Sequence, residues 1–377
     1  MAAYDAFLLL SFGGPEGPDD VLPFLENVTR GRGVPRERLA EVAGHYQAVG
    51  GVSPINGQCR ELLKSVAAAF AAGGINLPLY WGNRNWQPFI EDTVRQLKAD
   101  GAERVIAFVT SAYSSYSACR QYLDDIDRAV AAVPGAPRID KLRPYFNHPG
   151  FIEPFAASAE AALARLPDAA QARARLVFTA HSIPVGMAAA SGSRSTGTAV
   201  TAAVGGRYAA ELGEASRLIA ERTGSGAFPC DLVFQSRSGP PSVPWLEPDV
   251  TDHLAALAKG TAVDGTPLPQ GAPSGVVVVP VGFVSDHMEV VHDLDVAAAQ
   301  TAASIGLPFA RATAPGSTPR FAEMVRELVE ERVSGATPQA LGPFGPRAYP
   351  TSAFAGGAAS CPGDCCRYTP GRPSRPA

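Results

Sequence analysis

The chain passes from an apolar run into a glycine-rich turn in the stretch AFLLLSFGGP, residues 6–15. A second stretch, LVFTAHSIP at residues 176–184, repeats this layout of an apolar run followed by a turn. Continuous apolar runs of this length that end in a turn are typical of strands covered on both faces in a parallel sheet. We therefore expect each stretch to form the first strand of such a sheet.

Further short apolar runs recur along the chain, with helical patterns between them, such as residues 117–132 and 289–305. This alternation predicts βα units and hence a parallel sheet in each half of the chain. Strands are expected at residues 6–11, 78–82, 104–110, 139–142, 174–179, 231–235, 276–281 and 309–311. The predicted fold class is α/β, with two Rossmann-like domains, each a four-stranded parallel sheet flanked by helices.

The domain boundaries follow from this division of the strands. The first Rossmann-like domain is placed at residues 1–145 and the second at residues 146–318. Residues 319–333 carry apolar side chains at helical spacing, and we expect a helix there that packs back on the first domain. Residues 334–377 are rich in proline and glycine and are expected to form a coil extension that carries three cysteines.

Composition excludes several classes of function. The 377 residues hold 32 Lys+Arg against 36 Asp+Glu, a net charge of −4, with no long runs of like charge, so no nucleic-acid partner is expected. No apolar run approaches the roughly 18 residues of a membrane span, and the N-terminus lacks the basic start of a signal peptide. The six cysteines are too few for a disulfide scaffold. We therefore expect a cytoplasmic protein without a transmembrane segment.

The loops that follow the strands are the places to search for chemistry, because parallel sheets bind ligands at the carboxyl ends of their strands. His181 comes directly after the strand expected at residues 174–179, and Glu289 lies beyond the strand expected at residues 276–281. Glu289 and Asp293 are four residues apart, so an α-helix would place them on one face, about 6 Å apart along its axis. Two such carboxylates can hold a hard cation or pass protons to and from solvent.

These residues also have ordinary interpretations. Acidic side chains near the start of a helix are favoured by the helix dipole and can simply be solvated. A histidine at a strand end is often a hydrogen-bonded structural residue. The motifs of zinc proteases, serine esterases and Walker ATPases are absent, and GGPEG at residues 13–17 lacks the G-x-G-x-x-G spacing, so no nucleotide is expected.

Six segments that occur in order along the chain carry a resemblance to a known family. They are LSFGGP at residues 10–15, GGVSPI at 50–55, YWGN at 80–83 with PFIED at 88–92, TAHSIP at 179–184, QSRSGP at 235–240 with PWL at 244–246, and PVGFVSDHMEVVHDLD at 280–295. Together they resemble the ferrochelatase family over roughly residues 4–333, and most of all its coproporphyrin-type, iron–sulfur-containing actinobacterial branch. The resemblance implies a metal chelatase of the lyase class that inserts ferrous iron into a porphyrin, coproporphyrin III above all, in haem biosynthesis.

The resemblance also implies the partners of the protein. These are a porphyrin and ferrous iron as substrates and other haem-pathway enzymes for hand-off of the product. Separately, we expect a monomer, although the sequence leaves the oligomeric state open. Two other functions stay open. The protein could be a chelatase for another metal or tetrapyrrole, such as cobalt and a corrinoid precursor, or a porphyrin or haem carrier that uses the same cleft without turnover.

By resemblance, His181 is the catalytic histidine and Glu289 the acid opposite it, both at the metal and pyrrole-nitrogen face as ligands of the substrate iron. An imidazole with a pKa near 6.5 can accept a pyrrole proton or ligate iron at neutral pH. Asp293 backs Glu289 as a further catalytic acid and can continue a proton path. Which of His181 and Glu289 takes the pyrrole protons stays open.

Porphyrin-binding residues come partly from the resemblance and partly from chemistry. The positions that resemble porphyrin contacts of the family are Phe12, Tyr46, Ser53 and Tyr122. Several relatives carry an iron-ligating tyrosine where this chain has Phe12, so that axial ligand is absent here. Arg30 and Arg32 are candidates for binding porphyrin carboxylates, because a guanidinium pairs with a carboxylate through two hydrogen bonds, although both can be ordinary loop arginines.

Three cysteines crowd into the C-terminal extension, at Cys361, Cys365 and Cys366. Adjacent cysteines close a disulfide only with strain, so ligation of a metal or iron–sulfur cluster is the preferred interpretation. The resemblance implies a 2Fe-2S cluster, which needs a fourth thiolate, and Cys119 is the expected donor. We expect Cys230 to be a small buried apolar side chain instead. Free thiols in a disordered tail, or zinc in place of iron, are the alternatives.

Overall fold

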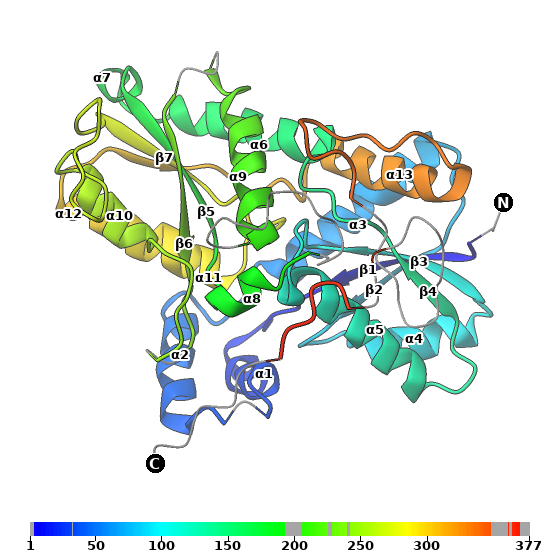
Figure 1. Ribbon diagram of the computed structural model, residues 1–377. Coiled ribbons are helices and arrows are strands. Elements are labelled where there is room, and N and C mark those ends of the chain that lie inside the picture. The colour runs from blue at the N-terminus through cyan, green and yellow to red at the C-terminus, as the bar shows by residue number, and fades with distance from the viewer. Residues whose placement is uncertain are drawn as a thin grey trace.

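The computed structural model describes residues 4–31, 33–192, 206–224, 228–239, 242–347, 361 and 364–369. In this part of the chain the strands form two four-stranded sheets, shown side by side in Figure 1. The first sheet has the order β2-β1-β3-β4 and the second the order β6-β5-β7-β8, and every pairing is parallel. The predicted α/β fold with two four-stranded parallel sheets is therefore confirmed.

Each strand begins and ends within two residues of its predicted limits. The strands are β1 (Ala6–Ser11), β2 (Leu79–Asn83), β3 (Arg104–Val109), β4 (Arg138–Lys141), β5 (Ala174–His181), β6 (Cys230–Gln235), β7 (Gly275–Val279) and β8 (Phe309–Arg311). Every residue of β1 and of β7 is buried, because helices cover both faces of each sheet. That double burial is why these strands appear in the sequence as unbroken apolar runs rather than as alternating ones.

Helices fill the connections between the strands. They are α1 (Val21–Val28), α2 (Arg36–Ala48), α3 (Ile55–Ala72), α4 (Ile90–Ala99), α5 (Gln121–Ala132), α6 (Pro149–Leu163), α7 (Asp168–Gln171), α8 (Val185–Ala189), α9 (Gly206–Ala220), α10 (Val250–Leu257), α11 (Met288–Val290), α12 (Ala299–Ser304) and α13 (Pro319–Ser334). Two π-helical segments, Tyr116–Arg120 and Val291–Ala298, run directly into α5 and α12. Short π-helical segments are rare and occur frequently at functional sites.

The prediction of one regular α-helix over residues 289–305 is wrong. The segment starts as the short α11, widens into the π-helix Val291–Ala298 and narrows again into α12. A π-helix closes its hydrogen bonds between residues five apart instead of four, so the α-helical stacking expected for Glu289 and Asp293 does not hold. Apolar spacing alone could not reveal the widening, because α- and π-helical turns bury similar sets of side chains.

The last helix joins the two halves of the molecule. On α13, Phe321, Met324, Val325 and Leu328 are all fully buried. α13 packs against α3 of the first half and α6 of the second, and in Figure 1 it lies beside both. One apolar core includes residues of both sheets and of α13. The boundaries at residues 145 and 318, and the assignment of residues 319–333 to the first domain, remain predictions.

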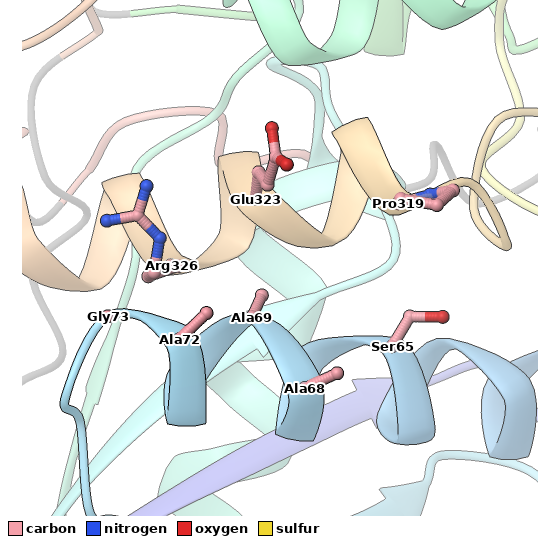
Figure 2. A pocket seen from close by; sticks show the side chains of 8 residues that line it. All are labelled: Ser65, Ala68, Ala69, Ala72, Gly73, Pro319, Glu323 and Arg326. Atoms are coloured by element: carbon pink, nitrogen blue, oxygen red, sulfur yellow. The ribbon is translucent and has the colours of Figure 1, made fainter.

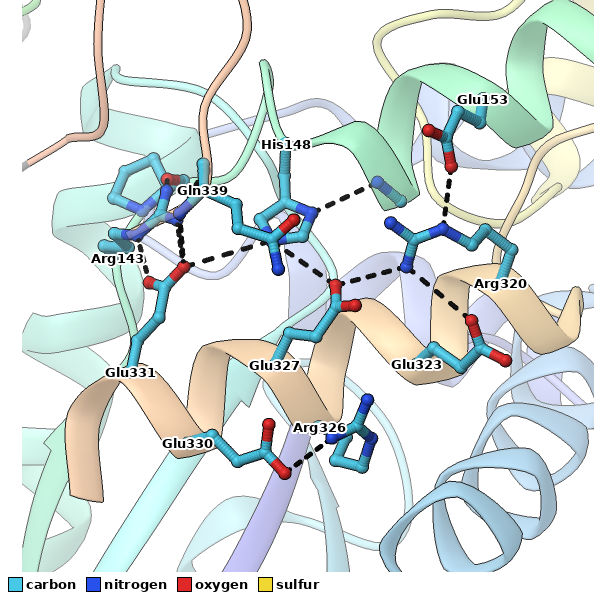
Figure 3. A network of polar contacts seen from close by, with 12 residues as sticks. Arg143, His148, Glu153, Arg320, Glu323, Arg326, Glu327, Glu330, Glu331 and Gln339 are labelled. Carbon is cyan, nitrogen blue, oxygen red and sulfur yellow. Dashed lines mark hydrogen bonds and ion pairs between the residues drawn. The ribbon is translucent and has the colours of Figure 1, made fainter. Parts of the chain in front are cut away.

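A buried polar network fastens α13 to the segment that connects the two sheets (Figure 3). The guanidinium of Arg143 is fully buried and binds both carboxylate oxygens of Glu331 at 2.8 Å. The backbone of Gln339 completes the pair, because its carbonyl accepts from Arg143 at 2.9 Å and its N–H donates to Glu331 at 2.8 Å. Charges this deeply buried are tolerated only when they are paired and hydrogen-bonded, so the network fixes where α13 lies.

His148 lies in the same network and has an unusual protonation equilibrium. Its Nδ1 accepts a hydrogen bond from the N–H of Gly150 at 3.1 Å and so caps α6, while its buried Nε2 has no hydrogen-bond partner. Nε2 lies 3.6 Å from a carboxylate oxygen of Glu327, too far for a hydrogen bond. Burial, with the positive charges of Arg143 and Arg320, lowers the pKa of His148 to about 3. The ring is therefore neutral in the folded protein at neutral pH.

Replacing His148 with asparagine is expected to flatten the pH dependence of stability between pH 6.5 and pH 3. In that window the unfolded chain binds a proton that the folded protein does not, so the free energy of unfolding falls as the pH falls, by up to about 1.4 kcal/mol per pH unit. Asparagine keeps a helix-capping side chain without a titrating group. Urea denaturation of both proteins from pH 7 to pH 4 measures the difference, and parallel curves would contradict the expectation.

Candidate active site

His181 is the last residue of β5, an inner strand of the second sheet. Its Nδ1 contacts the carbonyl oxygen of Ser182, which can only accept, so Nδ1 carries the proton of the neutral ring. The lone pair is then on Nε2, which lies 3.6 Å from Oε2 of Glu289. The side chain of His181 is 30% exposed, so the ring is not sealed in the core.

Glu289 lies in the first turn of α11, and its side chain is 47% exposed. The helix is capped by His287, whose Nδ1 accepts from the N–H of Glu289 at 3.2 Å. The same Nδ1 is 3.8 Å from Oε2 of Glu289. Burial lowers the pKa of His287 and outweighs the opposing effect of the Glu289 charge. Glu289 therefore stands between two imidazoles, of which His287 is held neutral.

Asp293, in the π-helix, is more confined than Glu289. One carboxylate oxygen accepts from the hydroxyl of Ser236, and the other lies 3.1 Å from Nδ1 of His292. Ser236 directly follows β6, and its neighbour Gln235 donates to the backbone carbonyl of Glu289 at 3.2 Å. The end of β6 therefore holds the whole acidic segment in place beside the end of β5.

The first half of the molecule closes the other side of this site through α2. The ring of His45 stacks on that of His292, with centroids 4.2 Å apart and planes inclined by 14°. Burial, and next the charge of Glu289, raise the pKa of Tyr46. A further link comes from α3, where Gln58 accepts from the N–H of Asp286 at 2.8 Å. The candidate site therefore lies between the two halves.

Two of the predicted porphyrin contacts, Phe12 and Tyr122, belong to one group of side chains with Phe24 and Arg84, which forms the wall of the first half. Phe12 is 38% exposed, an unusual exposure for a large apolar side chain, and it packs edge-on against Phe24. The guanidinium of Arg84 lies 5.8 Å from the ring of Phe12 and 4.6 Å from that of Tyr122, which is buried beneath it. Such cation–aromatic contacts hold the three side chains in one stack.

Ser53 and the arginine candidates lie at different depths. Ser53 is buried and donates its N–H to the carbonyl of Pro15 at 2.8 Å. It packs so closely on Gly14 that a Cβ there would lie 2.7 Å from its hydroxyl oxygen. Arg30 is exposed just after α1 and has no ion-pair partner among the described residues. Arg32 lies outside the described residues.

The structure gathers four cysteines from two distant segments. Cys119 is buried in the π-helical turn and its sulfur accepts from Nζ of Lys141 at 3.5 Å. Cys365 and Cys366 are buried with their sulfurs 3.7 Å apart, and Cys366 accepts from the N–H of Gly192 at 3.1 Å. A hydrogen bond to Cys365, followed by burial, raises the pKa of Cys361.

The thiol of Cys365 connects the other three. The hydrogen bond from Cys361 lowers the pKa of Cys365. Three effects raise this pKa, namely the hydrogen bond to Cys366, burial, and the charges of Cys366 and Cys119. Together they outweigh the first effect, and the pKa of Cys365 is about 12. Cys230 lies apart from this group and is exposed at the start of β6, so the expectation that it is buried is wrong. The first residue of β6 reaches the end of its sheet, where no helix covers the side chain.

Sequence reasoning missed several side chains of the site. His287 and His292 were visible as two histidines among four acids at residues 286–295, but nothing in their spacing indicated which carboxylate each one faces. Arg84 gave no signal, because its contacts with Phe12 and Tyr122 join distant segments. Among the described residues, no three His, Cys, Asp or Glu side chains are arranged to hold a metal ion together.

A separate groove lies between α3 and α13, as Figure 2 shows. Its volume is about 510 Å³, and small side chains of α3 face Glu323 and Arg326 of α13 across it. A Cβ at Gly73 would lie 2.6 Å from Cδ of Arg326, so only glycine lets this arginine cross the end of α3. None of the candidate site residues lines the groove.

No helix of the described residues combines the length and apolar character needed to span a membrane.

Comparison with known proteins gives consistent matches over nearly the whole chain. The ferrochelatase family model matches residues 4–333. The coproporphyrin III ferrochelatase of Nocardia farcinica is 54% identical over 341 residues, which cover 90% of this chain and 91% of that protein. The coproporphyrin III ferrochelatase of Streptomyces griseus is 48% identical over 388 residues, 100% of this chain and 96% of that one.

Likeness to solved structures is weaker. SirB from Bacillus subtilis with Fe3+ matches with a TM-score of 0.48 and 12% identity, covering 89% of this chain and 98% of that one. A likeness at this level carries no argument about function.

Proposed function

Because the chain belongs to the ferrochelatase family, we propose that it inserts ferrous iron into coproporphyrin III in haem biosynthesis and releases two protons. The observation that carries the proposal is the pairing of His181 Nε2 with Glu289 Oε2, 3.6 Å apart, at the strand ends between the two halves. The reaction needs a base for the pyrrole protons and oxygen or nitrogen donors for an iron that sheds water. This pair supplies both kinds of group.

His181 serves in this proposal as the base or as an iron ligand at the macrocycle. Its ring is fixed through Nδ1 on the carbonyl of Ser182, and Nε2 lies 3.6 Å from Oε2 of Glu289. A neutral imidazole can take a pyrrole proton or bind ferrous iron, but the single lone pair cannot do both at once. Whether proton uptake or iron binding at His181 comes first is a question for kinetic measurements.

Glu289 and Asp293 take different roles in this proposal. Glu289 is the more exposed and faces His181, so it is the acid that meets iron or protons first. Asp293 is anchored by Ser236 and His292 and can pass protons onward without moving. The neutral His287 behind Glu289 avoids a fixed positive charge that would repel ferrous iron.

The macrocycle would lie against the wall of the first half. We propose Phe12, Tyr46, Ser53 and Tyr122 as its contacts and Arg30 as a partner for a propionate. Phe12 supports this, because an exposed phenylalanine at a cleft edge offers apolar area to a flat ligand. Arg30 has no carboxylate partner of its own among the described residues, so it is available for one on the substrate.

A substrate panel tests the proposal. The protein is incubated anaerobically with coproporphyrin III or protoporphyrin IX and ferrous iron, and with sirohydrochlorin and cobaltous ion, and the Soret bands are followed. We expect the fastest change with coproporphyrin III and iron. A change only with sirohydrochlorin and cobalt would instead indicate a chelatase for another metal and tetrapyrrole, and binding without any metal insertion would indicate a carrier.

We further propose that Cys119, Cys361, Cys365 and Cys366 hold a 2Fe-2S cluster. The number of thiols fits, since such a cluster needs four, and the sulfurs of Cys365 and Cys366 lie 3.7 Å apart, with Cys361 hydrogen-bonded to Cys365 and Cys119 near enough to affect the pKa of Cys365. The described side chains are not arranged to bind a metal ion as they stand, so the thiols would have to move closer together around a cluster. Lys141, Arg207 and Arg347 lie beside these sulfurs and offer positive charge to thiolates. A bound cluster would supply a one-electron couple and a covalent tie between the tail and the first half.

Protein purified anaerobically is expected to contain about two iron and two sulfide per chain, as the proposed cluster requires. Cys119→Ser and Cys361→Ser should each lose this content and the visible absorption. Cys230→Ser is the matched control, since this exposed cysteine lies away from the group and should keep the content of the wild type. Zinc in place of iron, or four free thiols in the anaerobic protein, would rule the cluster out.

We also propose a cytoplasmic location, supported by the six cysteines of the described chain, none of which is joined to another in a disulfide. Thiols stay reduced in that compartment. A monomeric state and hand-off of the product to other haem-pathway enzymes stay predictions.

A further inference from the structure

The first turn of α9 touches the candidate catalytic histidine on one side. Tyr208 is buried, and its hydroxyl donates to the backbone carbonyl of His181 at 3.0 Å. His181 is the last residue of β5. The hydroxyl of Tyr208 therefore fixes the end of the strand from which the imidazole projects.

The same turn touches the cysteine group on its other side. Arg207 is buried, and it lies near enough to Cys365 and Cys366 that their thiolate forms would raise its pKa. It lies so close to Gly192 that a Cβ there would be 2.8 Å from its Nε. The N–H of Gly192 is the group that donates to the sulfur of Cys366. Two consecutive residues of α9 thus face the tail and the active site.

Short polar contacts hold this turn in place. The N–H of Tyr208 donates to the hydroxyl of Ser191 at 2.8 Å, and Ser191 in turn donates to the carbonyl of Ala188 at the end of α8. Gly206, the first residue of α9, approaches that same carbonyl so closely that a Cβ would lie 2.1 Å from it. A shift of residues 188–192 therefore moves Tyr208 as well.

One turn further along, Glu211 ties α9 to the other cysteine segment. Its buried carboxylate accepts from the N–H and the hydroxyl of Ser114, at 2.7 and 2.8 Å, and pairs with Arg347. Ser114 immediately precedes the cap of the π-helical turn that carries Cys119. The segment that carries Cys119 therefore connects to α9 through these hydrogen bonds, and Cys366 connects to it through Gly192, which Arg207 contacts.

We propose that the cysteine-bearing tail sets the position of His181 through the first turn of α9, and that Tyr208 is the positioning residue. The proposal deepens the proposed iron insertion and rests on it for the kinetic readout. When the tail holds Gly192 and Arg207, the hydroxyl of Tyr208 meets the carbonyl of His181 and the imidazole faces Glu289. When the tail is displaced, the turn loosens and the imidazole loses its fixed place, which slows the reaction without removing the porphyrin wall.

Tyr208→Phe removes only the hydroxyl and tests the positioning role. We expect kcat to fall about 3- to 10-fold with KM for coproporphyrin III nearly unchanged, because the ring still fills its place while the strand end is freed. Tyr145→Phe is the matched control, since Tyr145 is equally buried and donates to the strand-end carbonyl of Val109 at 2.9 Å, away from His181. Equal losses of kcat in both variants would overturn the proposal.

The coupling to the tail is measured with Cys366→Ser and the double variant. We expect Cys366→Ser to lower kcat by a similar factor and the double variant to be hardly worse than either single one, because both changes act through the same turn. Cys230→Ser should combine with Tyr208→Phe without interaction. If the double variant Tyr208→Phe/Cys366→Ser lost kcat by the product of the two single losses, the proposal would be overturned. Arg207→Gln replaces Cys366→Ser in the same design if the serine variant fails to fold.

A readout without turnover separates this proposal from the proposed function. Amide hydrogen exchange of full-length protein is compared for peptides that contain residues 181–183. We expect faster exchange there in Tyr208→Phe and in Cys366→Ser, and unchanged exchange in Tyr145→Phe. If the wild-type protein inserted no iron but the variants differed in exchange as expected, the chelatase function would be wrong and the coupling would stand. If exchange were unchanged in both Tyr208→Phe and Cys366→Ser, the coupling would be wrong.

Discussion

Replacing His181 with alanine is expected to lower kcat for iron insertion by about 10²- to 10⁴-fold while porphyrin binding is retained. Nε2 of the imidazole lies 3.6 Å from Oε2 of Glu289, and alanine leaves no base or ligand at that position. The wall formed by Phe12 and its neighbours is not altered by the change. Initial rates from the Soret band and binding from porphyrin fluorescence quenching measure the two quantities separately.

His253→Ala is the control for this experiment. His253 is a buried histidine of α10 that pairs with Asp231 at 3.0 Å, at the opposite end of β6 from Gln235. Its loss should lower stability and leave kcat unchanged. If His181→Ala kept most of its activity, or lost binding and rate together, the assignment of His181 as base or ligand would be wrong. A carrier has no turnover to lose, so the substitution would leave it unchanged or lower only its affinity for the porphyrin.

Replacing Arg143 with methionine is expected to lower the free energy of unfolding by about 3–5 kcal/mol. Arg143 is fully buried and Glu331 nearly so, and the two are joined by a pair of 2.8 Å hydrogen bonds. Methionine fills part of the volume but leaves the carboxylate of Glu331 buried without its cation. Urea denaturation at neutral pH gives the difference.

Two further variants identify the cause of that loss. Arg38→Met removes a partner of an exposed pair, with both side chains more than half exposed, and should cost less than about 1 kcal/mol. Arg143→Met combined with Glu331→Leu should recover much of the stability, since no charge is then left unpaired. Recovery stays partial because the N–H of Gln339 loses its acceptor. A double variant as unstable as Arg143→Met would show that packing, not charge, dominates.

The sheets could be predicted because their residues are buried on both faces. An unbroken run such as residues 276–279 cannot be solvated on either side, so the apolar pattern and the strand coincide. The position of His181 followed from the same reasoning, since the carboxyl ends of parallel strands meet at one edge. These inferences use local pattern and general topology alone.

The rest of the site depends on contacts between distant segments. The π-helical widening at Val291–Ala298 is not encoded in apolar spacing, and it decides that Asp293 faces Ser236 and His292. The approach of α2, which stacks His45 on His292, depends on how the two halves are joined. Tyr208 gave no sequence signal, because a buried tyrosine in a helix is ordinarily a core residue.

The packing of α13 against both halves has a consequence for folding during synthesis on the ribosome. The helix completes a core to which both sheets contribute, and Glu331 neutralises a cation that emerges far earlier, at Arg143. The domains of a nascent chain ordinarily fold one after another, beginning with the N-terminal domain. In this protein the first half cannot complete its core until residues 319–334 have been synthesised, and until then the apolar side of α3 and the guanidinium of Arg143 stay uncovered.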